Sequence, residues 1–194
     1  EKTENSVPFI IGQHGGHFGV TQFAFFEEHQ INIADKFLSW GWGSSNLKIK
    51  PFANIRMLKN KLKYNPNGDA IMIELCLPRY SYHLYAAPIS SQWLSYFSDQ
   101  CNFMKTLPHS LRERILVRLA KNDYGWDEQL RWENEFSKIK IDLGSNSIKK
   151  LLENSRLCIS TYNASSYLET LLWNMPTIIF WNEENWELNQ DAMP

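Results

Sequence analysis

The sequence predicts an α/β fold in which parallel sheets are covered by helices on both faces. Short apolar segments recur along the chain without polar/apolar alternation, which is typical of strands that are buried on both faces. Helical segments separate these strands, and the order strand, helix, strand favours parallel pairing. Ligand sites in such sheets lie at the carboxyl ends of the strands, so the loops that follow strands are the first places to look for chemistry.

The first unit places a strand at 7–11, a helix at 21–33 and a second strand at 36–40. A basic stretch at 46–64, interrupted by proline, is interpreted as a connection between two lobes, with a boundary near 50–68. Beyond it we expect strands at 70–76, 114–119, 138–142, 156–161 and 176–181, and helices at 90–106, 127–136, 147–154 and 165–174.

Composition and charge exclude several classes of protein. The chain has 194 residues, and 20 Lys and Arg against 21 Asp and Glu give a net charge of −1, which argues against a protein that coats nucleic acid. A hydrophobic content of 43% is typical of a folded domain. We find no apolar run that could span a membrane and no signal peptide, and 3 cysteines without paired spacing favour the cytoplasm. The chain starts without Met and stops without a closing element, so we expect it to be a piece of a longer protein.

A glycine-rich loop follows the first strand, at 12–19, and contains Gln13, His14 and His17. Glycines let the backbone approach a ligand closely, and the helix that follows would offer free N–H groups to an anion. The pattern is neither a dinucleotide fingerprint nor a Walker loop. The alternatives are a plain turn, or a metal site formed with the acids of Glu27-Glu28-His29, although the spacing differs from the HExxH pattern of zinc proteases.

Two carboxylates, Glu28 and Asp35, follow this loop. Seven residues apart on one helix, they would share a face. Asp35 stands directly before the strand at 36–40, where it could serve as nucleophile, base or helix-end residue. The alternative is that both are solvated helix charges.

Polar residues also follow two strands of the second half. Arg79 and Tyr82 come after the strand at 70–76, and their types suit the binding of carboxylate or phosphate. Arg118 stands inside an apolar strand, so we expect it to be either ion-paired or ligand-binding, and Asp123 lies in the loop beyond it.

A cluster of hydroxyl and amide side chains follows the strand at 156–161. It comprises Ser160, Asn163, Ser165, Ser166 and Glu169. Ser166 and Glu169 fit a capping box. The same residues, at the start of a helix, could form a phosphate cradle, with Glu169 facing ribose hydroxyls.

The motifs together resemble a known family. The chain contains, in this order, the motifs Gly-Gln-His-Gly-Gly, Glu-Glu-His with Ala-Asp-Lys-Phe-Leu-Ser-Trp-Gly-Trp, Leu-Pro-Arg-Tyr-Ser-Tyr, Val-Arg-Leu with Asp-Tyr-Gly-Trp, and Ser-Thr-Tyr-Asn-Ala-Ser-Ser-Tyr-Leu-Glu-Thr. With these motifs the chain resembles a family of bacterial surface-polysaccharide transferases. The family includes the retaining β-Kdo glycosyltransferases, which use CMP-Kdo (Kdo is 3-deoxy-D-manno-octulosonic acid). The resemblance implies a GT-B-like fold of two Rossmann-type lobes, here the end of the N-terminal lobe at 1–55 and an incomplete nucleotide-binding lobe at 56–194.

The resemblance also implies roles for the residues above. Asp35 would be the nucleophile and Glu28 a second catalytic carboxylate, with Gln13 and His14 lining the reacting sugar. The donor would be held by Arg79, Tyr82, Arg118, Asp123, Ser160, Asn163, Ser165, Ser166 and Glu169. We expect no metal and no cofactor besides the CMP-Kdo substrate, because Arg and N–H groups can meet the charge of a single phosphate.

Partners and alternatives follow from the same resemblance. The partners would be a nucleotide-sugar donor, a lipid-linked or oligosaccharide acceptor such as O-antigen or capsule, and the rest of the N-terminal lobe, but no nucleic acid. The basic stretch could contact an anionic membrane surface. Two other functions stay open: a transferase that uses a CDP-linked polyol phosphate, and a nucleotide- or glycan-binding module without catalysis. We expect Phe25, Phe26, Phe97 and Phe103 in the core, and Trp40, Trp42, Tyr82, Tyr124, Trp126 and Tyr162 beside the cleft.

Overall fold

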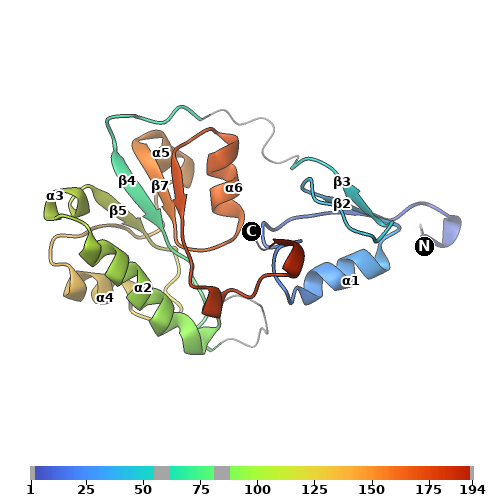
Figure 1. Cartoon of the computed structure of the whole chain (residues 1–194), viewed down its shortest axis with the longest axis horizontal. Helices are drawn as coiled ribbons and strands as arrows, with labels where there is room; N and C mark the ends of the chain where they lie inside the picture. The colour runs from blue at the N-terminus through green and yellow to red at the C-terminus, as the bar shows by residue number, and fades with distance from the viewer. Residues whose placement is uncertain (1–2, 55–61, 81–87, 193–194) are drawn as a thin grey trace.

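The computed structural model describes residues 3–54, 62–80 and 88–192, and these residues form two parallel sheets. Figure 1 shows the smaller sheet with its helix α1 at one end of the long axis and the larger sheet with its helices at the other. The α/β architecture with parallel strands, as in Rossmann-type and GT-B-like folds, is confirmed.

The smaller sheet has the order β1-β2-β3, formed by β1 (Ile10–Gly12), β2 (Lys36–Ser39) and β3 (Ile49–Pro51). Helix α1 (Phe25–Ile33) connects the first two strands, which pair in parallel. A small core holds the unit together, because Phe18, Ile31, Phe37 and Ile49 pack as one buried cluster.

Strand β3 corrects the interpretation of 46–64 as a connection throughout. Ile49–Pro51 pairs in parallel with β2, and Ile49 is buried against Phe37. The neighbouring Lys48 extends its Nζ to the carbonyls of Ile31, at 3.5 Å, and Asn32, at 2.8 Å, where α1 ends. A lysine at this point satisfies carbonyls that the helix leaves open and complements the helix dipole. Part of the basic stretch, 55–61, lies outside the described residues.

The larger sheet has the order β6-β5-β4-β7-β8 and is parallel throughout. Its strands are β4 (Asp69–Ile73), β5 (Ile115–Arg118), β6 (Lys140–Asp142), β7 (Ser155–Ser160) and β8 (Thr177–Ile179). The connecting helices are α2 (Trp93–Thr106), α3 (His109–Arg112), α4 (Glu128–Glu135), α5 (Ile148–Glu153) and α6 (Ser165–Leu172). The chain winds outward from β4 in both directions, so the winding reverses between β4 and β7, which is where ligands bind in doubly wound sheets.

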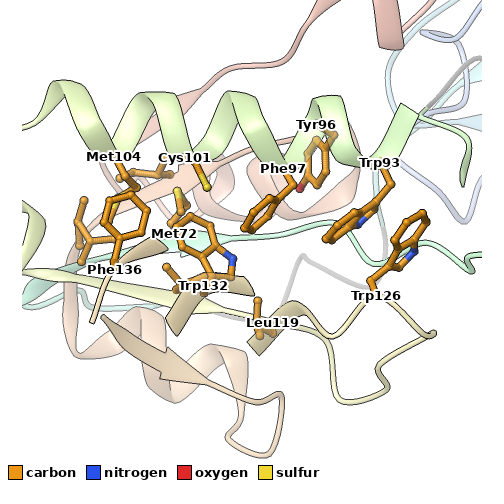
Figure 2. Close-up of a cluster of buried hydrophobic side chains, with 14 residues drawn as sticks. Met72, Trp93, Tyr96, Phe97, Cys101, Met104, Leu119, Trp126, Trp132 and Phe136 are labelled. Carbon is orange, nitrogen blue, oxygen red and sulfur yellow. The ribbon is translucent and has the colours of Figure 1, made fainter. Parts of the chain in front are cut away.

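Both faces of the larger sheet are buried, as the uninterrupted apolar strands predicted. On one face, Met72 of β4 packs with aromatic rings from α2 and α4; Figure 2 shows Trp93, Phe97 and Trp132 in this layer. On the other face, Ile71 and Ile73 pack with residues of α5 and β7. Successive residues of β4 therefore anchor opposite layers, which fixes the register of the strand.

The predicted positions of several aromatic residues are wrong. Phe25 and Phe26 are exposed, at 58% and 39%, because α1 begins at Phe25 and not near residue 21. Tight turns replace the expected first helical turn, since the N–H groups of both Val20 and Thr21 donate to the carbonyl of His17. Trp126, expected beside the cleft, is buried and stacks on Trp93 with ring centroids 4.4 Å apart.

No helix among the described residues is long and apolar enough to cross a membrane.

Candidate functional site

A crevice opens at the carboxyl edge of the larger sheet, where the winding reverses. It has a volume of about 320 Å³. Its walls come from the ends of β4 and β5 on one side and from the β7–α6 connection on the other, and they include Ile73, Glu74, Arg118, Leu119, Ala120, Ile148, Tyr162, Ser165, Ser166 and Glu169. Three of the predicted donor-binding residues (Ser165, Ser166 and Glu169) thus share one crevice with Arg118.

The first turn of α6 faces this crevice without the predicted capping box. The N-cap position is Ala164, whose methyl group cannot accept a hydrogen bond, so the correction concerns both Ser166 and Glu169. The Ser166 hydroxyl lies 3.4 Å from that of Ser160 instead. The helix therefore presents N–H groups and hydroxyls to the crevice, and this combination suits an anion.

The glycine loop of the smaller sheet lies directly against this turn. The N–H of Gly16 donates to the hydroxyl of Ser165 at 2.9 Å, across 149 residues of sequence. A Cβ on Gly16 would lie 2.7 Å from the carbonyl carbon of Ala164 and 2.7 Å from the nitrogen of Ser165. Glycine is therefore required for this contact between the two halves of the chain.

A second pocket, of about 330 Å³, lies between the two sheets. The loop and helix of the smaller sheet contribute His14, His17, Phe18, Thr21, Phe23 and Phe26, and the larger unit contributes Leu75, Leu77, Ala164 and Trp186. Ala164 lines this pocket and the adjacent Ser165 lines the crevice, so the two spaces meet at one peptide.

Gln13 organises the glycine loop. Its side chain is buried and donates to the carbonyl of Gly15 at 2.7 Å, while its Oε1 accepts from the N–H of Trp40 at 2.7 Å and from Nε1 of Trp42 at 2.8 Å. The oxygen and the nitrogen of the amide are both engaged in these contacts, so Gln13 holds the loop, and it is not among the residues that line the crevice or the second pocket.

The two histidines of the loop differ in environment. His14 is exposed and borders the second pocket, with its ring edge-on to Phe18 at 4.9 Å. His17 is partly buried, and burial together with the proximity of His14 lowers the pKa of His17. His17 is therefore neutral at physiological pH.

The carboxylate that contacts the glycine loop is Glu27, which the sequence analysis named only as a possible metal ligand. Its Oε2 accepts from the N–H of Gly19 at 2.8 Å, and burial raises the pKa of Glu27. Glu28, predicted as catalytic, is exposed on the next position of α1. The helical period separates the two, since neighbouring residues on a helix point about 100° apart.

Asp35 lies at the other end of the smaller sheet. Helix α1 ends at Ile33, so Asp35 shares no helical face with Glu28, and it precedes β2 at that strand's amino end. Its Oδ2 accepts from the N–H of Phe9 at 2.7 Å. Because β1 and β2 are parallel, Asp35 and Gln13 are separated by about the length of a strand. The structure does not bring Asp35 to either pocket.

The predicted arginines are engaged within the protein. Arg118 forms an ion pair with the buried Asp142 and donates to the carbonyl of Asn146 at 3.1 Å, so the ion-pair alternative is confirmed. Burial would raise the pKa of Asp142, but Asn146, Arg118 and the N–H of Gly144 together lower it. Arg79 is exposed and donates to the carbonyl of Gly125 at 3.0 Å, with its guanidinium over the ring of Trp126.

The other predicted donor-binding residues, Asp123, Asn163 and Tyr82, have different surroundings. Asp123 caps the loop before α4, since its carboxylate accepts from the N–H groups of Gly125, Trp126 and Asp127 at 2.9–3.1 Å. Asn163 is buried in the β7–α6 connection, beside the crevice residues. Tyr82 lies outside the described residues.

Two buried carboxyl groups went unnoticed in the sequence. Glu74 directly follows β4, and burial raises its pKa well above the usual range. Glu128 is the first residue of α4 and is 3% exposed; burial, assisted by the charge of Asp123, raises the pKa of Glu128 to about 7. The available signal for Glu74 was an acid inside the apolar run Ile-Met-Ile-Glu-Leu-Cys-Leu.

A buried hydroxyl relay ties the two strands that flank the crevice. The hydroxyl of Tyr96 accepts from the N–H of Leu75 at 2.7 Å and lies 2.6 Å from the Thr161 hydroxyl, which donates to the carbonyl of Ile73 at 2.8 Å. This network holds the ends of β4 and β7 in register, and so fixes the width of the crevice between them.

Within the described residues, no group of three or more His, Cys, Asp or Glu side chains is arranged to hold a metal ion. The possible metal set that includes His14, His17 and Glu28 is thus not assembled in this structure.

The fold and the crevice define an α/β protein of the doubly wound class with a candidate binding site at the carboxyl edge of the larger sheet. A family model described as "LIC12162 family transferase" matches residues 1–194, so the chain belongs to the LIC12162 family of transferases. A search of curated proteins and a search of solved structures gave no match. Membership of this family supports a transferase, and therefore a protein that binds a donor and an acceptor.

Proposed function

We propose that this transferase is a glycosyltransferase that holds a nucleotide-sugar donor across the crevice, with the sugar directed into the second pocket. The observation that carries the proposal is the meeting of the two spaces at Ala164 and Ser165. A donor has a nucleotide part and a transferable part joined through phosphate. Two adjoining pockets with a helix amino terminus between them suit that arrangement.

The phosphate of the donor would lie at the first turn of α6. Ser166 offers a hydroxyl there, and the helix dipole favours a negative charge. Ser165 also lines the crevice, and its hydroxyl accepts a hydrogen bond from the N–H of Gly16. Phosphate binding at Ser165 would therefore affect the position of the glycine loop. Glu169, one turn further along α6, also lines the crevice and would accept hydrogen bonds from ribose hydroxyls.

The second pocket would receive the sugar. Its lining is largely apolar, with the exposed rings of Phe23 and Phe26 and with the imidazole of His14 at its border. Aromatic surfaces pack well against the C–H faces of sugars, and an imidazole can move a proton during transfer. Asp35 is not part of this assignment, because it lies at the amino end of β2.

The finer assignment is CMP-Kdo as donor, transferred with retention onto a bacterial surface glycan. The motif resemblance supports it, and the single phosphate of CMP matches one helix amino terminus. We also propose the division into an N-terminal part at 1–55 and a nucleotide-binding part at 56–194. The separation of the two sheets, within 10–51 and 69–179, supports this division.

The test is equilibrium binding of CMP to the full chain, followed by transfer from CMP-Kdo to a glycan acceptor with the longest natural chain that contains it. Ser166→Asp places a carboxylate where the phosphate would lie, so we expect CMP affinity to fall at least tenfold. Ser110→Asp puts the same charge on the exposed surface of α3, which precedes the amino end of β5 and so lies at the opposite edge of the sheet, and should leave affinity unchanged. Absence of CMP binding, or equal affinity in both variants, would overturn the proposal.

The same experiment separates the alternatives. Tighter binding of CDP than of CMP would favour a transferase that uses a CDP-linked polyol phosphate. Binding of CMP without any turnover of CMP-Kdo by the longer chain would favour a binding module.

A further inference from the structure

The chain returns to the smaller sheet after it leaves β8. Residues 186–192, the return segment, run from the larger sheet to the loop before α1, and Figure 1 shows them in red. Two backbone hydrogen bonds, of 2.8 and 2.9 Å, and one antiparallel bridge pair 187–189 with 20–22. The return segment is therefore attached to the chain directly after the glycine loop.

The side chain of Asn189, in the return segment, reaches the glycine loop itself. Its Nδ2 donates to the carbonyl of Gly19 at 2.8 Å, and its Oδ1 accepts from the N–H of Ala192 at 2.9 Å. A carbonyl on one side and an N–H on the other leave one orientation of the amide in which both bonds form. The contact with Ala192 therefore holds the amide nitrogen toward Gly19.

Gly19 is held by three neighbours. Its N–H donates to Oε2 of Glu27 at 2.8 Å, and its carbonyl accepts from Asn189. Its φ of +77° lies in the region that glycine adopts freely, and a Cβ there would lie 2.5 Å from the ring of Trp42. Because a glycine-rich backbone has many accessible conformations, these contacts fix the course of the loop at this point.

The residues on either side of Gly19 form one wall of the second pocket. This wall consists of His17, Phe18 and Thr21. Asn189 is not among the described residues that line the pocket, so it would act on a ligand through Gly19 and not by contact. The crevice, in contrast, takes none of its described lining from 12–22 or from the return segment.

We infer that Asn189 is a positioning residue for the sugar: it holds the carbonyl of Gly19 and so sets the wall of the second pocket against which the sugar of the donor lies. The inference rests on the proposed function, because it takes the second pocket as the sugar site. Group transfer depends on alignment of the reacting atoms, and a displacement of about 1 Å costs up to about 100-fold in rate. A loop rich in glycine has little rigidity of its own, so the return segment supplies it.

The experiment compares the affinities of CMP and CMP-Kdo for the full chain and for three variants. Asn189→Asp keeps an acceptor for Ala192 but turns a carboxylate oxygen toward the carbonyl of Gly19, which opens that contact. Because only CMP-Kdo carries the sugar, we expect its affinity to fall about tenfold while the affinity for CMP stays within about twofold. Asn189→Gln retains the donor and should lose less. Asn65→Asp makes the same charge change on an exposed residue before the amino end of β4 and should change neither affinity.

Amide hydrogen exchange without ligand gives a second readout. In Asn189→Asp the amides of 17–21 should exchange about three- to tenfold faster, as expected for the loss of one neutral hydrogen bond, and in Asn65→Asp they should not change.

Equal losses of affinity for CMP and CMP-Kdo would mean that Asn189 only stabilises the fold. That result, unchanged affinity for CMP-Kdo, or unchanged exchange at 17–21 would overturn the positioning role and leave the phosphate site standing. Failure of CMP to bind the unaltered chain would instead overturn the proposed function, and the inference with it.

Discussion

The N–H of Gly16 donates to the hydroxyl of Ser165 at 2.9 Å, and this contact joins the glycine loop of the smaller sheet to the first turn of α6. The crevice lies on one side of the contact and the second pocket on the other. Any ligand that occupies both spaces must pass this point. Under the proposed function, binding of the donor would therefore be linked to the position of the glycine loop.

The first prediction concerns the fit of Gly16. Gly16→Ala should lower the free energy of unfolding by about 1–3 kcal/mol, because the added Cβ would lie 2.7 Å from rigid backbone at Ala164. Gly12→Ala is the matched control, since a Cβ there meets nothing within 4 Å. Chemical denaturation of both variants checks the prediction. Equal stability would mean that the glycine loop does not dock on α6 in solution.

The second prediction concerns Asp35. Asp35→Asn should cost about 1 kcal/mol of stability, since it weakens the hydrogen bond that the carboxylate accepts from Phe9, and should leave CMP binding and transfer unchanged. Denaturation and a transfer assay check the two parts. A folded variant without transfer activity would instead establish Asp35 as the nucleophile that the motif resemblance implies.

The hydroxyl of Tyr96 provides the third prediction. Tyr96→Phe leaves the N–H of Leu75 without its acceptor and removes the buried link to Thr161, so we expect a loss of about 1–3 kcal/mol. Tyr124→Phe removes an exposed hydroxyl and should stay within about 0.5 kcal/mol of the unaltered chain. Thermal unfolding of the pair measures the difference. If the two variants were equally stable, the relay would not hold the crevice together.

The fourth prediction is a pH dependence of stability. The pKa of Glu128 is raised in the folded state from an ordinary value of 4.5 to about 7, so between these values the folded chain retains a proton that the unfolded chain has lost. Stability therefore falls as pH rises through this window, by about 1.4 kcal/mol per pH unit for one proton. The buried Glu74 adds a slope of the same sign, so urea denaturation at pH 5, 6 and 7 should show a slope that is smaller in Glu128→Gln than in the unaltered chain by about the contribution of this one proton. Identical slopes in the two proteins would exclude Glu128 as its source.

The sequence predicted the larger sheet well because β4 and β7 are apolar without alternation, and burial on both faces leaves that pattern in the residues themselves. The sequence analysis did not predict β3, because a strand of three residues that ends in proline is too short to show a hydrophobic period. That proline occupies the last position of the strand, next to the break at 52–54.

The site was predicted in part for similar reasons. Ser165, Ser166 and Glu169 come together because they start one helix directly after a strand, a local relationship that the sequence contains. The predicted position of Asp35 beside Gln13 does not match the structure. Asp35 comes just before β2 and Gln13 comes just after the parallel strand β1, so the two residues lie at opposite edges of the smaller sheet. Glu128 stayed hidden because an acid in the first turn of a helix is ordinarily exposed, and only the packing of α4 against the sheet buries it.

The central claim is that a nucleotide occupies the crevice between β4 and β7 with its phosphate at α6. Amide hydrogen exchange of the full chain with and without CMP tests this most directly, because it locates the ligand on the backbone. The account predicts protection of 163–167 and of 118–121, where the crevice walls meet. Protection confined to other segments, with these amides unchanged at saturating CMP, would contradict it.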